Sequence, residues 1–135
     1  MMMFGNRKAL ALMLALTAFT AGCTTPMYAG PEKPLSEVAV LEMGCGFIAA
    51  IDGKKTPYSG GMYGKFVVLP GEHELSVMMS ETCRYRSDAQ LKIWFVAEAG
   101  HRYLVSVQTN ANFRWIPEVI DQTSKKQVGF FKQGR

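Results

Sequence analysis

The chain has 135 residues and a formal net charge of +4, from 15 basic and 11 acidic side chains. Arg7 and Lys8 lie near the N-terminus, so the rest of the chain carries 13 basic and 11 acidic side chains, a net charge of +2. So small an excess argues against a nucleic-acid partner, which usually requires a strongly basic surface. About 110 residues follow the N-terminal segment, which is enough for one domain with its own hydrophobic core.

The N-terminal segment predicts an export signal. Arg7 and Lys8 precede an apolar run over residues 9–18, and small residues follow before Cys23. This layout is typical of a cleaved secretory signal. A membrane-spanning helix needs about 20 consecutive apolar residues, whereas the stretch 9–21 is shorter and is interrupted by two threonines. An ordinary secretory signal and an uncleaved membrane span are the alternatives.

The end of this segment resembles the bacterial lipoprotein signal peptide. Ala21 and Gly22 directly precede Cys23, as in that family, while Thr20 stands where the family usually has Leu. The resemblance implies that residues 1–22 are removed and that Cys23 carries acyl chains such as palmitate. Stable anchoring then depends on the diacylglycerol together with an amide-linked chain, because one acyl chain binds membranes only marginally.

Thr24, the residue after Cys23, bears on localisation. In the resembled class an Asp at this position favours retention in the inner membrane, so Thr24 implies the outer membrane of a Gram-negative cell. We therefore expect a lipid-anchored protein on the periplasmic or cell-surface side of the outer membrane.

The composition after the signal predicts a linker and one domain. Residues 23–36 contain three prolines and one glycine but almost no aliphatic side chains, so they are expected to form a flexible tether after the lipidated cysteine. Residues 37–135 are expected to form the folded domain.

Cys45 and Cys83 are the other two cysteines of a chain that is expected to enter an oxidising compartment. If Cys23 is acylated, an even number of cysteines remains to form disulfides. We predict a disulfide between them, which stabilises the fold by roughly 4 kcal/mol in the chain-entropy model. Two buried free thiols and a pair of metal ligands are the alternatives.

From residue 37 onward, short segments rich in β-branched and aromatic residues alternate with turns that contain Gly, Pro or Asn. Within one segment Leu91, Ile93 and Phe95 share a face, as expected of a strand. The pattern predicts an all-β fold, a single small antiparallel β-sandwich of about seven to eight strands, with a small barrel as the alternative. The expected strands cover residues 38–41, 47–51, 65–69, 74–79, 90–96, 103–109, 114–120 and 127–131.

Three turn motifs recur between the expected strands. They are Ile-Asp-Gly-Lys at residues 51–54, Pro-Gly-Glu-His at 70–73 and Ala-Gly-His-Arg-Tyr at 99–103. The first two motifs together resemble the short β-sandwich modules called PEGA domains, and the order of all three resembles a group of small uncharacterised proteobacterial lipoproteins. The resemblance covers about residues 38–107, and it implies a β-sandwich fold without shared catalytic residues.

His73 and His101 are the only histidines, and each lies just after a turn glycine. Two imidazoles with Glu72, Glu74 or Glu98 have the chemistry of a metal site, but the histidines are not closely spaced. Rings in such turns also bond a loop carbonyl or face solvent. Because no signature of an activated Ser or Cys appears either, we predict a non-enzyme without metal or cofactor.

Two groups of residues are candidate contacts for a partner. Tyr58, Met62 and Tyr63 lie in the longest and most glycine-rich connection, a composition typical of adaptable contact surfaces. Arg84 and Arg86 form a second group that suits an anionic glycan or lipid head group. The alternatives are tyrosines folded back onto the sandwich and a strand edge protected by its charges.

These observations together predict a non-enzymatic outer-membrane lipoprotein that serves as an envelope binding or structural module. Its expected partners are the membrane, through Cys23, and an envelope protein or glycan. The alternative functions are a carrier of a small molecule or metal and an inhibitor of a hydrolase.

Overall fold

The structure, a computed structural model, describes residues 24–57, 64–79, 83, 87, 89–112 and 114–132. Within these residues no helix is both long enough and apolar enough to cross a bilayer. The described elements are β1 Thr24–Pro26, a 3₁₀ helix η1 Leu35–Glu37, β2 Ala39–Met43, β3 Phe47–Ile51, β4 Lys54–Lys55, β5 Lys65–Val68, β6 Gly71–Met78, β7 Gln90–Ala97, β8 Arg102–Thr109, β9 Trp115–Asp121 and β10 Lys126–Gln127.

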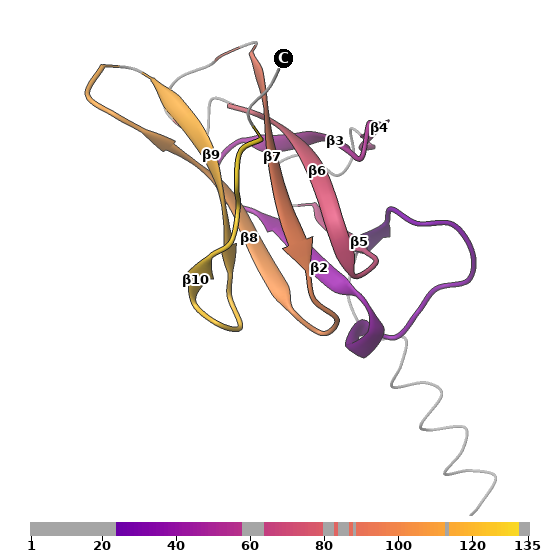
Figure 1. The fold of residues 1–135 in the computed structure, drawn as a ribbon. Coiled ribbons are helices and arrows are strands. Elements are labelled where there is room, and N and C mark those ends of the chain that lie inside the picture. Colours follow the sequence, from indigo (N-terminus) through magenta and orange to yellow (C-terminus); the bar gives the residue numbers. More distant parts are fainter. Residues whose placement is uncertain are drawn as a thin grey trace, which may run out of the picture.

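The strands form two packed sheets, which confirms the predicted all-β sandwich (Figure 1). One sheet has the strand order β1-β5-β2-β8-β9-β10 and the other the order β4-β3-β6-β7. Neighbouring strands are antiparallel except in the pairs β1–β5 and β2–β8, which are parallel. In Figure 1, β9 and β10 lie on one side of the sandwich, and β1, β4 and β5 lie on the other.

The alternation of side chains along the strands places the core between the sheets. Ile93 and Phe95 of β7 are fully buried, as are Tyr103 and Val105 of β8, whereas Val96 is 53% exposed. The rings of Phe95 and Tyr103 pack across the two sheets with their centroids 4.9 Å apart. The Tyr103 hydroxyl accepts a hydrogen bond from the backbone N–H of Glu98, so this buried polar atom has a partner.

The β3–β4 hairpin bears out the turn signal in the sequence. Asp52 and Gly53 both have positive φ, of 53° and 79°, which is the backbone that a two-residue hairpin of type I′ requires. Asp and Gly adopt this conformation more readily than most residues.

The segment expected to be a flexible linker differs from that expectation at its start. Residues Thr24–Pro26 form β1, which pairs in parallel with β5, and Met27 N–H then donates to the Val67 carbonyl. Two β-branched threonines favour a strand, and the edge position tolerates Pro26, which has no N–H to donate. The rest of the segment, as far as η1, contains no strand.

The last expected strand, residues 127–131, is divided between the two sheets. β10 pairs with β9 in one sheet, while Phe130 exchanges two backbone hydrogen bonds with Trp94 of β7 in the other. Gly129 makes this crossing possible, since a Cβ at that position would lie 2.5 Å from the Ile93 side chain. The C-terminal segment therefore joins the two sheets along the β7 and β9 side.

Candidate functional site

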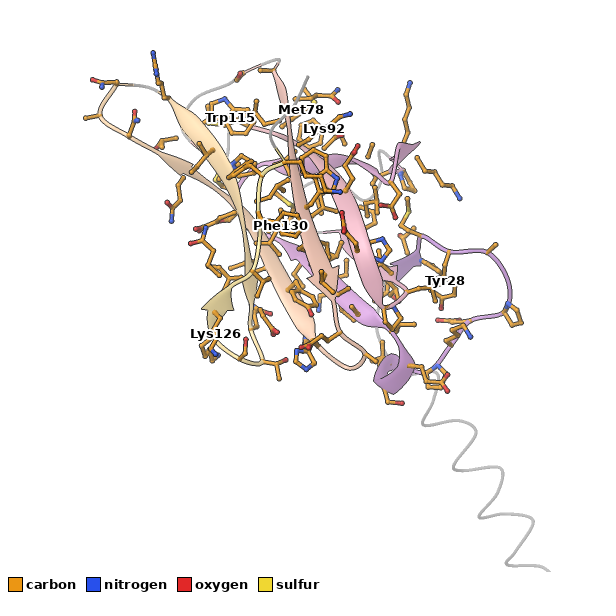
Figure 2. The ribbon with its side chains drawn as sticks, viewed as in Figure 1. Tyr28, Met78, Lys92, Trp115, Lys126 and Phe130 are labelled. Carbon is orange, nitrogen blue, oxygen red and sulfur yellow. A yellow bond between two sulfur atoms is a disulfide. The ribbon has the colours of Figure 1, made fainter. Side chains whose placement is uncertain are left out.

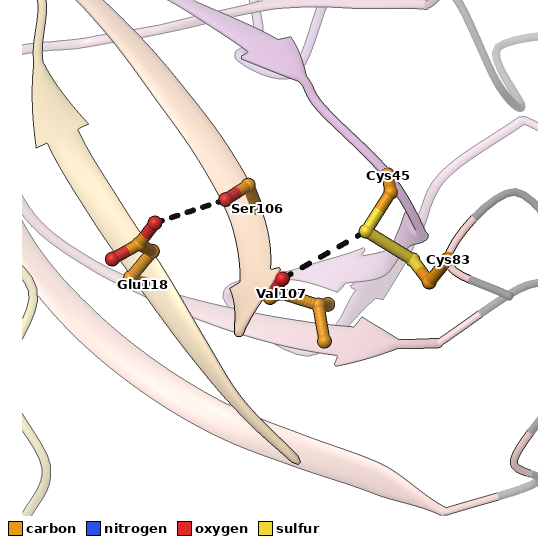
Figure 3. The surroundings of a disulfide bond; sticks show 5 residues. All are labelled: Cys45, Cys83, Ser106, Val107 and Glu118. Atoms are coloured by element: carbon orange, nitrogen blue, oxygen red, sulfur yellow. Dashed lines mark hydrogen bonds between the residues drawn. A yellow bond between two sulfur atoms is a disulfide. The ribbon is translucent and has the colours of Figure 1, made fainter. Parts of the chain in front are cut away.

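The predicted disulfide between Cys45 and Cys83 is present (Figure 3). It links residues 38 positions apart, and the two Cα atoms are 5.1 Å apart, within the usual range. Cys83 is buried, and Cys45 Sγ lies 3.8 Å from the Val107 carbonyl oxygen of β8. The bond therefore connects the β2–β3 connection to the segment after β6, against the core.

Both histidines are paired with aspartates. The Nδ1 atom of His73 lies 2.5 Å from Asp52 Oδ2, and its Nε2 lies 2.6 Å from the Leu69 carbonyl oxygen. The second oxygen of Asp52 accepts the backbone N–H of Glu74. This network ties the β3–β4 turn to the start of β6 and to the residue after β5, and it includes the loop carbonyl that the sequence predicted as one partner of the ring.

His101 makes the second pair. Its Nδ1 lies 2.8 Å from Asp121 Oδ2 and 3.3 Å from Glu98 Oε2. The Asp121 side chain is only 3% exposed, and its other oxygen accepts the backbone N–H groups of Thr123 and Ser124. Asp121 thus holds both the β7–β8 turn and the β9–β10 turn.

The two histidines lie at the ends of a continuous line of rings, which we call the histidine row: His73, Phe95, Tyr103 and His101. The ring centroids of His73 and Phe95 are 6.0 Å apart, and those of Tyr103 and His101 are 6.3 Å apart. The buried Phe95–Tyr103 pair lies between them. The row therefore brings the two polar networks to the same end of the sandwich, on either side of the core.

The electrostatics of the second pair follow from its contacts. The hydrogen bond to Asp121, with its negative charge and that of Glu98, raises the pKa of His101 above its ordinary value of 6.5. Burial opposes ionisation of Asp121, but the hydrogen bonds from His101, Thr123 and Ser124 prevail and lower its pKa below 3.8. The pair is thus an imidazolium and a carboxylate over the range between those two values.

Glu98, His101 and Asp121 offer three ligand atoms within 4.8 Å of one another, the donor set of a divalent metal site. In a tetrahedral zinc site with bonds of about 2.0–2.2 Å, neighbouring ligand atoms are about 3.3–3.5 Å apart. The 2.8 Å between His101 Nδ1 and Asp121 Oδ2 is instead the length of a charge-assisted hydrogen bond. The arrangement therefore suits a shared proton better than a metal ion.

The remaining predicted site residues are Cys23, the candidate partner contacts and the carboxylates considered beside the histidines. Cys23, Tyr58, Met62, Tyr63, Arg84 and Arg86 all lie outside the described residues. Of the carboxylates considered beside the histidines, Glu98 contacts His101, whereas Glu74 pairs with Lys92 and Glu72 with Lys132. Lys132 also lies over the Trp94 ring, 5.3 Å from its centroid.

Sequence reasoning did not identify Asp52 and Asp121 as the partners of the histidines. Asp52 directly follows β3 and Asp121 is the last residue of β9, so each begins a turn, which is a usual place for an Asp that caps backbone N–H groups. That signal predicts the turn, but it does not predict which distant side chain binds the second carboxylate oxygen of the aspartate.

No family model, curated protein or solved structure matches this chain. The fold and the described contacts define its class as a small, two-sheet β-sandwich with one disulfide and two aspartate–histidine pairs.

Proposed function

We propose that this protein is a non-enzymatic lipoprotein of the bacterial outer membrane, anchored through Cys23, whose β-sandwich binds a partner in the cell envelope or supports envelope structure. The domain is proposed to be PEGA-like, on the strength of the first two of its three turn motifs. The Asp52–Gly53 turn and the two histidine turns, which contain these motifs, each close a connection between strands.

The observation that carries the proposal is the Cys45–Cys83 disulfide. Stable disulfides are typical of exported proteins, because cytosolic thiols are kept reduced. An export compartment is also what the charged and apolar N-terminal segment predicts. With two cysteines paired, Cys23 is the one cysteine left for acylation.

The engagement of both histidines supports a non-enzymatic role. A histidine that activates a nucleophile needs a hydroxyl or thiol within hydrogen-bond reach. Among the residues that the structure describes, the hydrogen-bond partners of the two rings are Asp52, the Leu69 carbonyl and Asp121. These contacts join turns to one another, so the rings stabilise the fold.

Mass spectrometry of the protein purified from the envelope fraction tests the anchor. We expect a mature chain that begins at Cys23 and carries diacyl or triacyl mass. A matched Cys23→Ser variant should lose the adduct and move to the soluble fraction, while the disulfide is retained. An intact chain from Met1, or an unmodified soluble Cys23 in the wild type, would contradict the anchor and the localisation together.

Crosslinking in intact envelopes, followed by affinity capture, tests the binding role. We expect Tyr58, Met62 and Tyr63 to make the main contact, and Arg84 and Arg86 a second one. Deletion of residues 59–62 should then abolish capture of the partner and leave the melting temperature nearly unchanged. A deletion that unfolds the domain would place the tyrosines in the core, and undiminished capture would place the contact elsewhere.

A further inference from the structure

We infer that the sandwich lies directly on the membrane by one edge, here called the anchor edge, which consists of β1 and β4 with the exposed lysines Lys54 and Lys55. The bilayer surface, rich in anionic phospholipid head groups, is the partner of this edge. The inference rests on the proposed lipid anchor at Cys23, and it specifies how that anchor holds the domain.

The chain between the proposed anchor and the fold is short. Thr24, the residue after Cys23, is already paired with Lys65 of β5, and Thr25 and Pro26 continue the strand. Because Cys23 directly precedes Thr24 in the chain, the proposed lipid is attached one residue before the first paired residue of the sheet, and consecutive Cα atoms are about 3.8 Å apart. A free tether of about 13 residues would instead let the domain move tens of ångströms from the bilayer.

The position of β1 in its sheet determines which edge is near the proposed anchor. β1 is the outermost strand of its sheet, and β10 is the strand at the opposite edge. Because six strands spaced about 4.8 Å apart form the sheet, the two edges are about 24 Å apart. An anchor next to β1 therefore brings the β1 edge to the bilayer and holds β10 away from it.

Positive charge lies on the same side of the molecule as β1. β4 is the edge strand of the second sheet and consists of Lys54 and Lys55, which are both exposed. Figure 1 shows β4 on the β1 and β5 side of the sandwich, away from β9 and β10. Among the described residues neither lysine makes an ion pair, so both ammonium groups are available to lipid phosphates.

The opposite edge offers a matched control. Lys125 and Lys126 are also consecutive, exposed and without an ion pair among the described residues, but they belong to the β9–β10 hairpin. Figure 2 shows Lys126 on the side of the molecule opposite Tyr28, which follows β1. Charge alone would make the two lysine pairs equivalent, whereas an anchor beside β1 makes only Lys54 and Lys55 contact lipid.

Förster resonance energy transfer from a donor dye on the protein to acceptor lipids tests the inference. The sample is the full acylated protein in vesicles of phosphatidylethanolamine and phosphatidylglycerol. Donors are attached to Ala29→Cys, exposed in the loop after β1, or to Gln127→Cys, exposed in β10. We expect transfer from position 29 to be higher by roughly twofold or more, given the edge separation of about 24 Å. Equal transfer, or more from position 127, would overturn the inference.

Neutralising each lysine pair in turn tests whether Lys54 and Lys55 contact the lipid. Lys54→Gln with Lys55→Gln should reduce the difference in transfer between the two positions, whereas Lys125→Gln with Lys126→Gln should leave it unchanged. Replacing phosphatidylglycerol by a zwitterionic lipid should also reduce the difference in transfer, as Lys54→Gln with Lys55→Gln does. An equal response of both double variants would contradict a role for the anchor edge in contacting lipid.

Two further measurements distinguish a failure of this inference from a failure of the proposed function. Insertion of a Gly-Ser segment of about 12 residues after Cys23, with ends about 20 Å apart on average, should bring the two transfer efficiencies together. Mass spectrometry of every sample reports the lipid on Cys23 and the intact Cys45–Cys83 bond. An absent adduct overturns the proposed function and with it this inference, whereas an acylated protein with equal transfer overturns this inference alone.

Discussion

His101 and Asp121 come from different turns of the chain, yet they form one ion pair in which His101 Nδ1 lies 2.8 Å from Asp121 Oδ2. The aspartate is almost completely buried, and its second oxygen accepts two backbone N–H groups of the β9–β10 turn. One carboxylate therefore holds two connections in place at the end of the sandwich that carries the histidine row.

This pair predicts a defined pH dependence. The pKa of His101 is raised, so its protonation stabilises the fold below about pH 6.5 and the contribution is lost as pH rises through the folded pKa. The pKa of Asp121 is lowered, so its ionisation stabilises the fold above about pH 3.8 and the contribution is lost as pH falls through the folded pKa. The pair therefore contributes most between pH 4 and 6.5, roughly.

We expect nuclear magnetic resonance titration to give His101 a pKa above 6.5 in the wild type and a lower one in Asp121→Asn. The loss of stability in this variant should be larger near pH 5.5 than near pH 9, as measured by urea unfolding. Glu98→Gln is the matched control, and it should act weakly because Glu98 is 65% exposed and lies 3.3 Å from the ring. An unchanged His101 titration in Asp121→Asn would show that the pair is not formed in solution.

The Cys45–Cys83 bond predicts a large dependence of stability on redox conditions. A variant with Cys45→Ala and Cys83→Ala should lose about 2–5 kcal/mol of unfolding free energy. Reductant should destabilise the wild type by a similar amount and leave the double variant unaffected. Urea titrations with and without reductant measure this, and labelling of both thiols in the unreduced wild type would refute the bond.

Gly46, next to Cys45, predicts a backbone site that tolerates no side chain. Its φ is +89°, and a Cβ would lie 2.6 Å from the Met78 carbonyl oxygen. Gly53 has a similar φ of +79° but open space around it, so it isolates the cost of the dihedral angle. We expect Gly53→Ala to cost about 1–2 kcal/mol, and Gly46→Ala about 1–3 kcal/mol more because the backbone must shift. Equal losses in urea unfolding would contradict the close approach.

The geometry around His101 predicts that zinc leaves the protein unaffected. Because the 2.8 Å contact with Asp121 is a hydrogen-bond distance, a metal would have to displace the shared proton and separate the two groups. We expect the melting temperature at pH 7 to be the same with zinc or with a chelator. A rise with zinc that disappears in His101→Gln would favour the metal carrier, since a ligand that binds only the folded state stabilises it.

The strands and their faces could be predicted from the sequence because the signals are local. The two-residue period of β7 is visible in Leu91, Ile93 and Phe95, and the Asp52–Gly53 dipeptide identifies the β3–β4 turn. The Cys45–Cys83 bond was also predictable, because these are the two cysteines that follow the N-terminal segment expected to direct export to an oxidising compartment.

The pairing of distant segments could be decided only in three dimensions. The residue pattern of β2 is compatible with many neighbours, and the fold selects β8 in parallel because both strands bury their apolar faces against the same core. The pattern of Thr24–Pro26 has too few apolar residues to predict a strand. These residues form one because the edge of β5 has backbone groups available for pairing. Asp121 meets His101 for the same reason: a hydrogen bond across 20 residues depends on which strands lie side by side, and the burial of the whole core determines that.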